Sequence, residues 1–169
     1  MLNRIERPLI DMANPPEAVR VQIEDLAALT LFEGISREQL AKLAPLFRWI
    51  SFAAGQQVFA AGEPAREMYV IESGEVRLWL NPDDGGCLEI GRIRPSGMLG
   101  RSAVLGRPEY TASAECVTDA RLLAVRGRAV RRILRADSAL GRLLLERMAR
   151  MGNNQSTGWH DQLMKLFRR

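Results

Sequence analysis

The spacing of apolar residues changes twice along the chain and separates it into three parts. Apolar positions three and four residues apart predict short helices over residues 21–29 and 36–45, and a capping box, Ser36 followed by Gln39, begins the second. Over residues 47–125, short β-rich runs alternate with glycines, which predicts a small barrel or sandwich. Helical spacing then returns. The predicted fold is therefore mainly β with flanking helices.

The β part contains six candidate strands. They cover residues 57–60, 68–72, 76–80, 88–93, 111–117 and 122–125. Residues 81–86 read Asn-Pro-Asp-Asp-Gly-Gly, a composition typical of an exposed hairpin tip. We expect this tip to join two strands and to carry no chemistry.

The last strongly periodic segment is an amphipathic helix, for which Ser138 is the expected N-cap. Its apolar stripe consists of Leu140, Leu144, Met148 and Met151. This stripe has three uses that the sequence leaves open. It can pack on the barrel, pack on the same helix of a second copy, or relay a shift driven by a ligand.

The net charge of +4 conceals an asymmetry along the chain. Residues 1–120 carry −5 and residues 121–169 carry +9, almost all of it from arginine. A solvated helix face explains this pattern, and so does an anionic partner such as nucleic acid, a membrane surface or an acidic protein. The final apolar residues alternate with cations, a composition that suits contact with a membrane surface, docking on a partner or a cap over the barrel opening. They are Trp159, Leu163, Leu166 and Phe167.

Cysteine and histidine are too few for most site chemistry. Cys87 and Cys116 cannot staple a secreted scaffold, and His160, the single histidine, cannot build a metal site. No apolar run reaches the roughly 18 residues of a membrane span, and the first ten residues lack the apolar block of a secretory signal. We therefore expect a cytoplasmic, non-catalytic protein that requires no cofactor.

Three runs resemble the cyclic nucleotide-binding domain family. They are Leu-Phe-Glu-Gly-Ile-Ser at 31–36, Tyr-Val-Ile-Glu-Ser-Gly-Glu-Val at 69–76 and Gly-Met-Leu-Gly at 97–100. The resemblance implies a jelly-roll-like β-barrel, a small helical element before it and two helices after it, the second of them long. It also implies a division into an N-terminal arm with a short helix (1–29), the domain itself (30–151) and a basic amphipathic tail (152–169).

Members of that family hold the cyclic phosphate in a cassette, where a Gly-Glu pair binds the ribose hydroxyl and an arginine pairs with the phosphate. The matching glycine is Gly100, but Arg101 occupies the glutamate position and Tyr110 the arginine position. An arginine cannot accept a hydrogen bond, and a phenol donates only a neutral one. Two lost charge-assisted bonds of about 1.5–3 kcal/mol each weaken binding by about a hundredfold or more. We therefore expect no ordinary cyclic AMP binding.

The cassette still contains groups that suit another anionic ligand, such as a different cyclic nucleotide or a cyclic dinucleotide. The candidate ligand-binding residues are Gly100, Arg101, Ser102, Arg107, Tyr110 and Thr111. We expect a stand-alone regulatory domain that acts through a protein partner and dimerises through its last helix. Two alternatives stay open: a ligand-independent interaction or dimerisation module, and an anionic-surface binder that uses the tail. The 18 residues after Met151 cannot form a helix-turn-helix core, so we expect no sequence-specific DNA binding.

Overall fold

The computed structural model describes residues 19–81, 85–136, 138–151 and 165. Two antiparallel sheets form the body, with strand orders β1-β2-β9-β4-β7 and β3-β8-β5-β6. The strands are β1 (Val19–Arg20), β2 (Phe47–Phe52), β3 (Gln57–Phe59), β4 (Glu67–Ser73), β5 (Val76–Leu80), β6 (Leu88–Ile93), β7 (Met98–Leu99), β8 (Ser113–Cys116) and β9 (Ala120–Arg126). This confirms the predicted mainly β, jelly-roll-like architecture with a helix after it.

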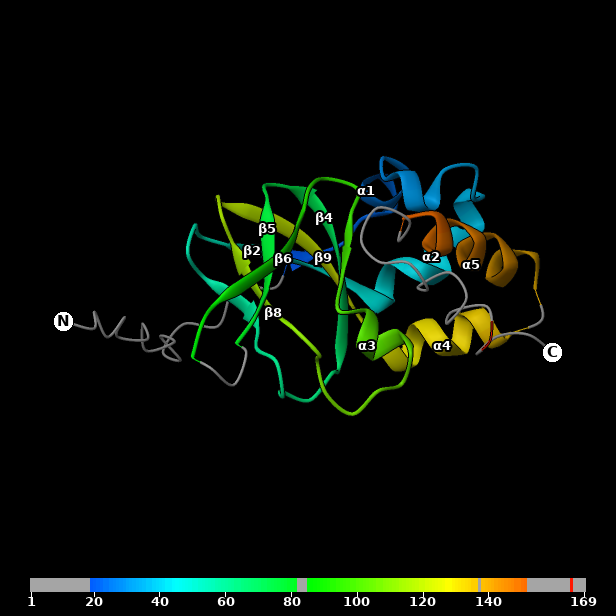
Figure 1. Ribbon diagram of the computed structural model, residues 1–169. Coiled ribbons are helices and arrows are strands. Elements are labelled where there is room, and N and C mark those ends of the chain that lie inside the picture. Colours follow the sequence, from blue (N-terminus) through cyan, green and yellow to red (C-terminus); the bar gives the residue numbers. More distant parts are fainter. Residues whose placement is uncertain (1–18, 82–84, 137, 152–164, 166–169) are drawn as a thin grey trace.

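The helices gather at one end of the β body, as Figure 1 shows for α2, α4 and α5. They are α1 (Ile23–Ala27), α2 (Arg37–Leu43), α3 (Arg101–Val104), α4 (Gly127–Arg135) and α5 (Ala139–Met151), with 3-10 turns η1 (Thr30–Phe32) and η2 (Ala44–Leu46). The predicted capping box is present at the start of α2, where the Ser36 hydroxyl accepts from the Gln39 amide. Ser138 likewise accepts from the Gly141 amide at 3.1 Å and caps α5.

Apolar residues form two cores, one on each face of the first sheet. Along β4, Met68 and Val70 pack on the helical side, whereas Tyr69 and Ile71 point into the barrel, because successive side chains of a strand face opposite ways. The helices therefore cover one face of this sheet, and the second sheet covers the other.

Strand β2 is the longest of three strands, β1, β2 and β7, that are missing from the sequence-based prediction. Its residues Phe47 and Trp49 are buried among the helices, while Ile50 belongs to the barrel interior. Because apolar residues are buried on both faces of β2, the alternation that begins with Phe47, Arg48 and Trp49 breaks at Ile50. The predicted strands at 76–80 and 88–93 agree with β5 and β6.

The apolar stripe of α5 packs within its own chain. Leu144 and Met148 are buried, and Leu140 and Met151 lie against the same core cluster. Val21 and Leu26 also belong to this cluster, so the expected division before residue 30 is not a packing boundary. Of the three uses open to the stripe, the structure shows packing on the helical side of the barrel.

The two free thiols differ in accessibility, which allows a chemical test of the barrel. Cys87 is exposed, whereas Cys116 is fully buried and burial raises the pKa of its thiol to about 11. Since the thiolate is the reactive form, iodoacetamide at about pH 8 should label one cysteine per folded chain and both after denaturation, measured by mass spectrometry. Cys87→Ser should abolish labelling of the folded chain. Equal labelling of both thiols before denaturation would contradict the closed barrel.

Candidate functional site

The backbone of β4 lies so close to Gly100 that this position requires glycine. Gly100 has a φ of +74° between β7 and α3, and a Cβ added there would lie 2.4 Å from the carbonyl oxygen of Glu67. A left-handed backbone against a neighbouring strand leaves room for glycine alone. Gly100 therefore sets α3, which begins at the next residue, directly against β4.

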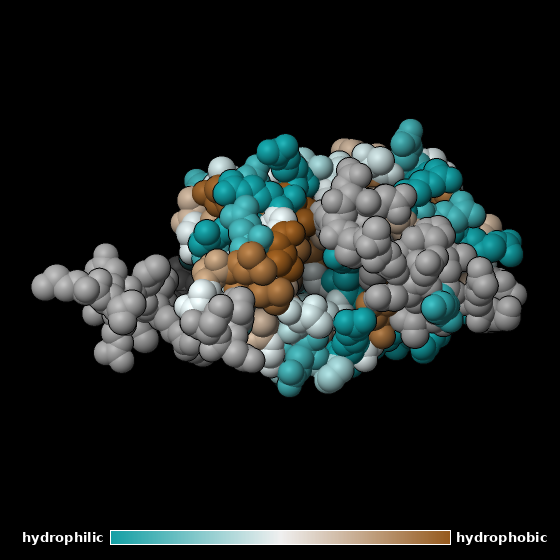
Figure 2. Space-filling view, viewed as in Figure 1, coloured by the Kyte–Doolittle hydropathy of each residue, from teal (hydrophilic) through white to brown (hydrophobic). Residues whose placement is uncertain are grey.

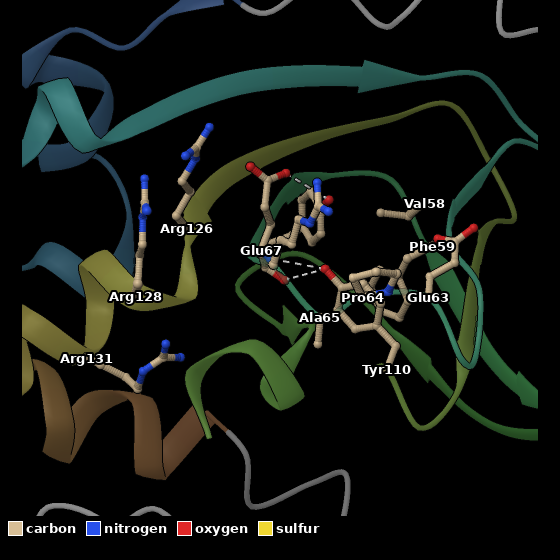
Figure 3. A pocket seen from close by; sticks show the side chains of 12 residues that line it. Val58, Phe59, Glu63, Pro64, Ala65, Glu67, Tyr110, Arg126, Arg128 and Arg131 are labelled. Atoms are coloured by element: carbon tan, nitrogen blue, oxygen red, sulfur yellow. Dashed lines mark hydrogen bonds between the residues drawn. The ribbon is translucent and has the colours of Figure 1, made fainter. Parts of the chain in front are cut away.

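The side chain of Tyr110 packs inside the barrel and forms hydrogen bonds to the backbone of β4. Its ring is buried and stacks on Phe59 with centroids 3.9 Å apart. Its hydroxyl donates to the carbonyl oxygen of Glu67 at 2.9 Å and accepts from the Glu67 amide at 3.1 Å (Figure 3). Burial raises the pKa of the phenol, so it remains neutral. Tyr110, which the resemblance places at the family's arginine position, thus joins the loop before β8 to the backbone of β4.

The other five predicted site residues do not line the pocket that Tyr110 lines. Arg101 is half-buried on α3, where desolvation lowers the pKa of its guanidinium, and Ser102 beside it is buried. Arg107 and Thr111 are exposed on the loop that follows α3. Of the six candidate ligand-binding residues, Tyr110 is the one that lines the pocket next to the cassette.

That pocket has a volume of about 710 Å³ and lies between the β3–β4 loop, the end of β9 and the start of α4. Figure 3 shows Arg126, Arg128 and Arg131 on one side of it and Phe59 and Tyr110 on the other. The full lining is Val58, Phe59, Glu63, Pro64, Ala65, Arg66, Glu67, Tyr69, Tyr110, Arg126, Arg128 and Arg131.

The pocket carries more positive than negative charge. Four arginines and two glutamates line it, and Glu67 is already neutralised by Arg48 of β2, whose Nη2 lies 2.6 Å from Glu67 Oε2. Tyr69 also donates to this carboxylate at 3.2 Å. Arg131 donates from Nη1 to the carbonyl oxygen of Ala103 in α3. The arrangement therefore suits an anion.

The sequence shows the excess of arginine after residue 120 but not the pocket. Arg128 and Arg131 are three residues apart and so lie on one face of α4, which is a readable signal. Arg66, by contrast, reaches the same pocket from the loop before β4, and no local pattern connects it with α4.

Other expectations concern metal ligands, membrane-spanning helices, the tail and the hairpin tip. Within the described residues, no group of three or more His, Cys, Asp and Glu side chains could hold a metal. In the same part of the chain, no helix is long and apolar enough to cross a membrane. The tail residues Trp159, Leu163, Leu166 and Phe167 and the hairpin residues 82–84 lie outside the described residues.

Comparison with known proteins agrees with the resemblance noted from the sequence. A family model described as "Cyclic nucleotide-binding domain" matches residues 49–137, more than half of the chain. A CRP-like cAMP-activated global transcriptional regulator of Mycobacterium tuberculosis is 30% identical over 135 residues, which cover 78% of this chain and 60% of the regulator. The chain thus spans well under the full length of this relative.

Solved structures give the same result for the fold. A cAMP-binding acyltransferase of Mycobacterium smegmatis superposes with a TM-score of 0.67 at 26% identity, over 78% of this chain and 40% of the acyltransferase. A candidate cyclic nucleotide-binding protein of Geobacter metallireducens superposes with a TM-score of 0.68 at 22% identity, over 80% of this chain and 98% of that one. With the barrel, the cassette glycine and the family model in agreement, the chain belongs to the cyclic nucleotide-binding domain family.

Proposed function

We propose that this chain is a non-catalytic regulatory domain whose cassette does not hold cyclic AMP in the way usual for its family. The observation that carries this proposal is the double hydrogen bond of the Tyr110 hydroxyl to the backbone of Glu67. A cyclic phosphate at this position meets a neutral, already bonded phenol instead of a guanidinium. Binding there would break both bonds and the stacking of Tyr110 on Phe59.

The second cassette position disfavours the sugar in the same way. Arg101 stands where the family has a glutamate, and a guanidinium has no acceptor for a ribose hydroxyl. A ligand of the cassette would instead use Arg101 and Arg107 with the hydroxyls of Ser102 and Thr111. We propose that any such ligand is another nucleotide, with cyclic dinucleotides as the first class to test.

The relatives support a regulatory role exerted through other proteins or domains. The matched region covers 60% of a transcriptional regulator and 40% of an acyltransferase, so this domain type occurs beside different partners. We propose that residues 30–151 sense a signal and pass it to a protein partner. Neither direct DNA recognition nor an activity of its own is part of this proposal.

Calorimetry with cyclic AMP tests the cassette argument. The protein should show no cyclic AMP binding at about 100 μM ligand, because both charged contacts of the family are missing. The paired substitution Arg101→Glu with Tyr110→Arg should gain affinity. Arg107→Glu with Tyr110→Arg, which makes the same charge changes with one of them displaced, should not. Micromolar or tighter binding by the unaltered chain would contradict the proposal.

A second candidate function is a ligand-independent interaction module, and the surface of β6 favours it. Leu88 and Ile90 are 53% and 47% exposed on this edge strand, and Figure 2 shows apolar surface over the same region. Edge strands with exposed apolar side chains readily pair with another chain. This edge is available to a second copy of the chain, whereas Leu144 and Met148 are buried within their own chain. Failure of cyclic AMP, cyclic GMP and cyclic di-GMP to bind in the same calorimetry would favour this candidate.

A further inference from the structure

We propose that the arginine-lined pocket beside the cassette binds a small phosphorylated molecule that carries at least two negative charges. Of the cassette positions, Tyr110 borders this pocket, whereas Gly100, Arg101 and Ser102 do not line it. The proposal does not depend on whether the cassette binds a nucleotide.

The first observation is uncompensated charge. Among the described residues, no acidic side chain pairs with the guanidinium of Arg66, Arg126 or Arg128, although all three line the pocket. Two arginines elsewhere on the β body do have such partners: Arg77 pairs with Glu115, and Arg92 pairs with Glu75 and Glu89. Like charges around one cavity repel one another, and a bound anion removes this repulsion.

The second observation is that the backbone holds these arginines together. The Gly127 amide donates to the carbonyl oxygen of Arg66 at 2.9 Å, which joins the β3–β4 loop to the start of α4. A Cβ at Gly127 would lie 2.2 Å from the carbonyl oxygen of Ala103, so only glycine allows α4 to begin so close to α3. Arg126 and Arg128 flank this glycine. Their guanidinium groups therefore project from a fixed framework, which lowers the entropy cost of binding.

The third observation is the position of Arg131 one turn along α4. One of its nitrogens is anchored on the carbonyl oxygen of Ala103. A guanidinium has five N–H donors in a planar fork, so donors remain for a ligand. Phosphate groups bind well to an arginine that is held in place and still has free N–H donors.

The opposite wall indicates the remainder of the ligand. Phe59, Pro64 and Tyr110 present ring and apolar surface there, and the Glu63 carboxylate accepts from the Ala60 amide while retaining acceptor capacity (Figure 3). A cavity of about 710 Å³ falls within the range of small-molecule sites. A concave pocket of this size favours a small molecule over a membrane or a nucleic acid duplex. Four arginines suit a phosphate of higher charge than the single negative charge of a cyclic nucleotide.

Titration of the full chain with inorganic pyrophosphate, followed by calorimetry and thermal unfolding, tests the proposal. Pyrophosphate should bind, raise the unfolding temperature, and bind more weakly as salt is added. Arg126→Gln with Arg128→Gln should weaken binding by at least about tenfold. Arg132→Gln is the matched control, because Arg132 is exposed on the same helix but does not line the pocket, and it should leave binding unchanged.

Three results would overturn the proposal. The first is no pyrophosphate binding at about 1 mM, a concentration that detects even weak sites. The second is equal weakening by Arg132→Gln, which would indicate diffuse attraction to a basic helix. The third is binding of acidic vesicles or oligoglutamate that pyrophosphate does not displace. Because Arg101 and Tyr110 are unaltered in all these proteins, each result is separable from the cyclic AMP experiment.

Discussion

Gly100→Ala should destabilise the folded chain by about 3–5 kcal/mol, the sum expected for backbone strain and for a forced contact in a packed region. The added methyl group would lie 2.4 Å from the Glu67 carbonyl oxygen and 3.2 Å from the Met68 Cα, both of them backbone atoms of β4. Neither atom can move without disturbing the pairing of β4 with β9. Urea unfolding followed by circular dichroism measures the effect.

Gly62→Ala is the matched control for this experiment. Gly62 also has a positive φ, +84°, but an added Cβ would meet no atom within 4 Å. The substitution should therefore lower the free energy of unfolding only by the strain of a left-handed backbone, about 1–2 kcal/mol. Equal losses for the two variants would mean that the approach of Gly100 to β4 does not constrain the fold.

Tyr110→Ala should destabilise the chain by about 3–5 kcal/mol, as expected for deletion of a buried aromatic ring. The substitution removes the stacking on Phe59 at 3.9 Å and leaves the amide and carbonyl of Glu67 without their partner. Chemical denaturation again gives the free energy of unfolding. A loss below about 1 kcal/mol would contradict the bracing role, since even one net hydrogen bond contributes that much.

Tyr110→Phe separates the two contributions. The ring and its stacking remain, and only the hydroxyl bonds to Glu67 are lost, so the cost should be about 1–3 kcal/mol. If this variant were as unstable as Tyr110→Ala, the hydrogen bonds alone would account for the stability that Tyr110 contributes. A stable Tyr110→Phe protein with an unstable Tyr110→Ala protein would assign most of the effect to packing.

Local features were predictable because their causes lie within a few residues. In the capping box at Ser36 and the N-cap at Ser138, each serine hydroxyl accepts a hydrogen bond from an amide only three residues later in the chain. Strands β5 and β6 follow from runs bounded by turn residues. Strand β2 was missed because its burial comes from helices and strands distant in the sequence.

The candidate site was predictable as a set of positions but not as a geometry. The resemblance placed Gly100, Arg101 and Tyr110 in the cassette and led to the expectation that all three face a ligand. The structure instead brings Tyr110 against Phe59 and Glu67, residues more than forty positions earlier in the chain. It also gathers Arg66 with the arginines around the start of α4.

The sequence by itself determined the succession of a helical part, a β part and a second helical part, the family and the two altered cassette positions, because periodicity, capping and residue identity are local properties. Only the tertiary structure decided that the phenol of Tyr110 braces β4 and that Arg66, Arg126 and Arg128 share one pocket. The physical reason is that hydrogen bonds and charge repulsion act through space, between groups that folding brings together from distant parts of the chain.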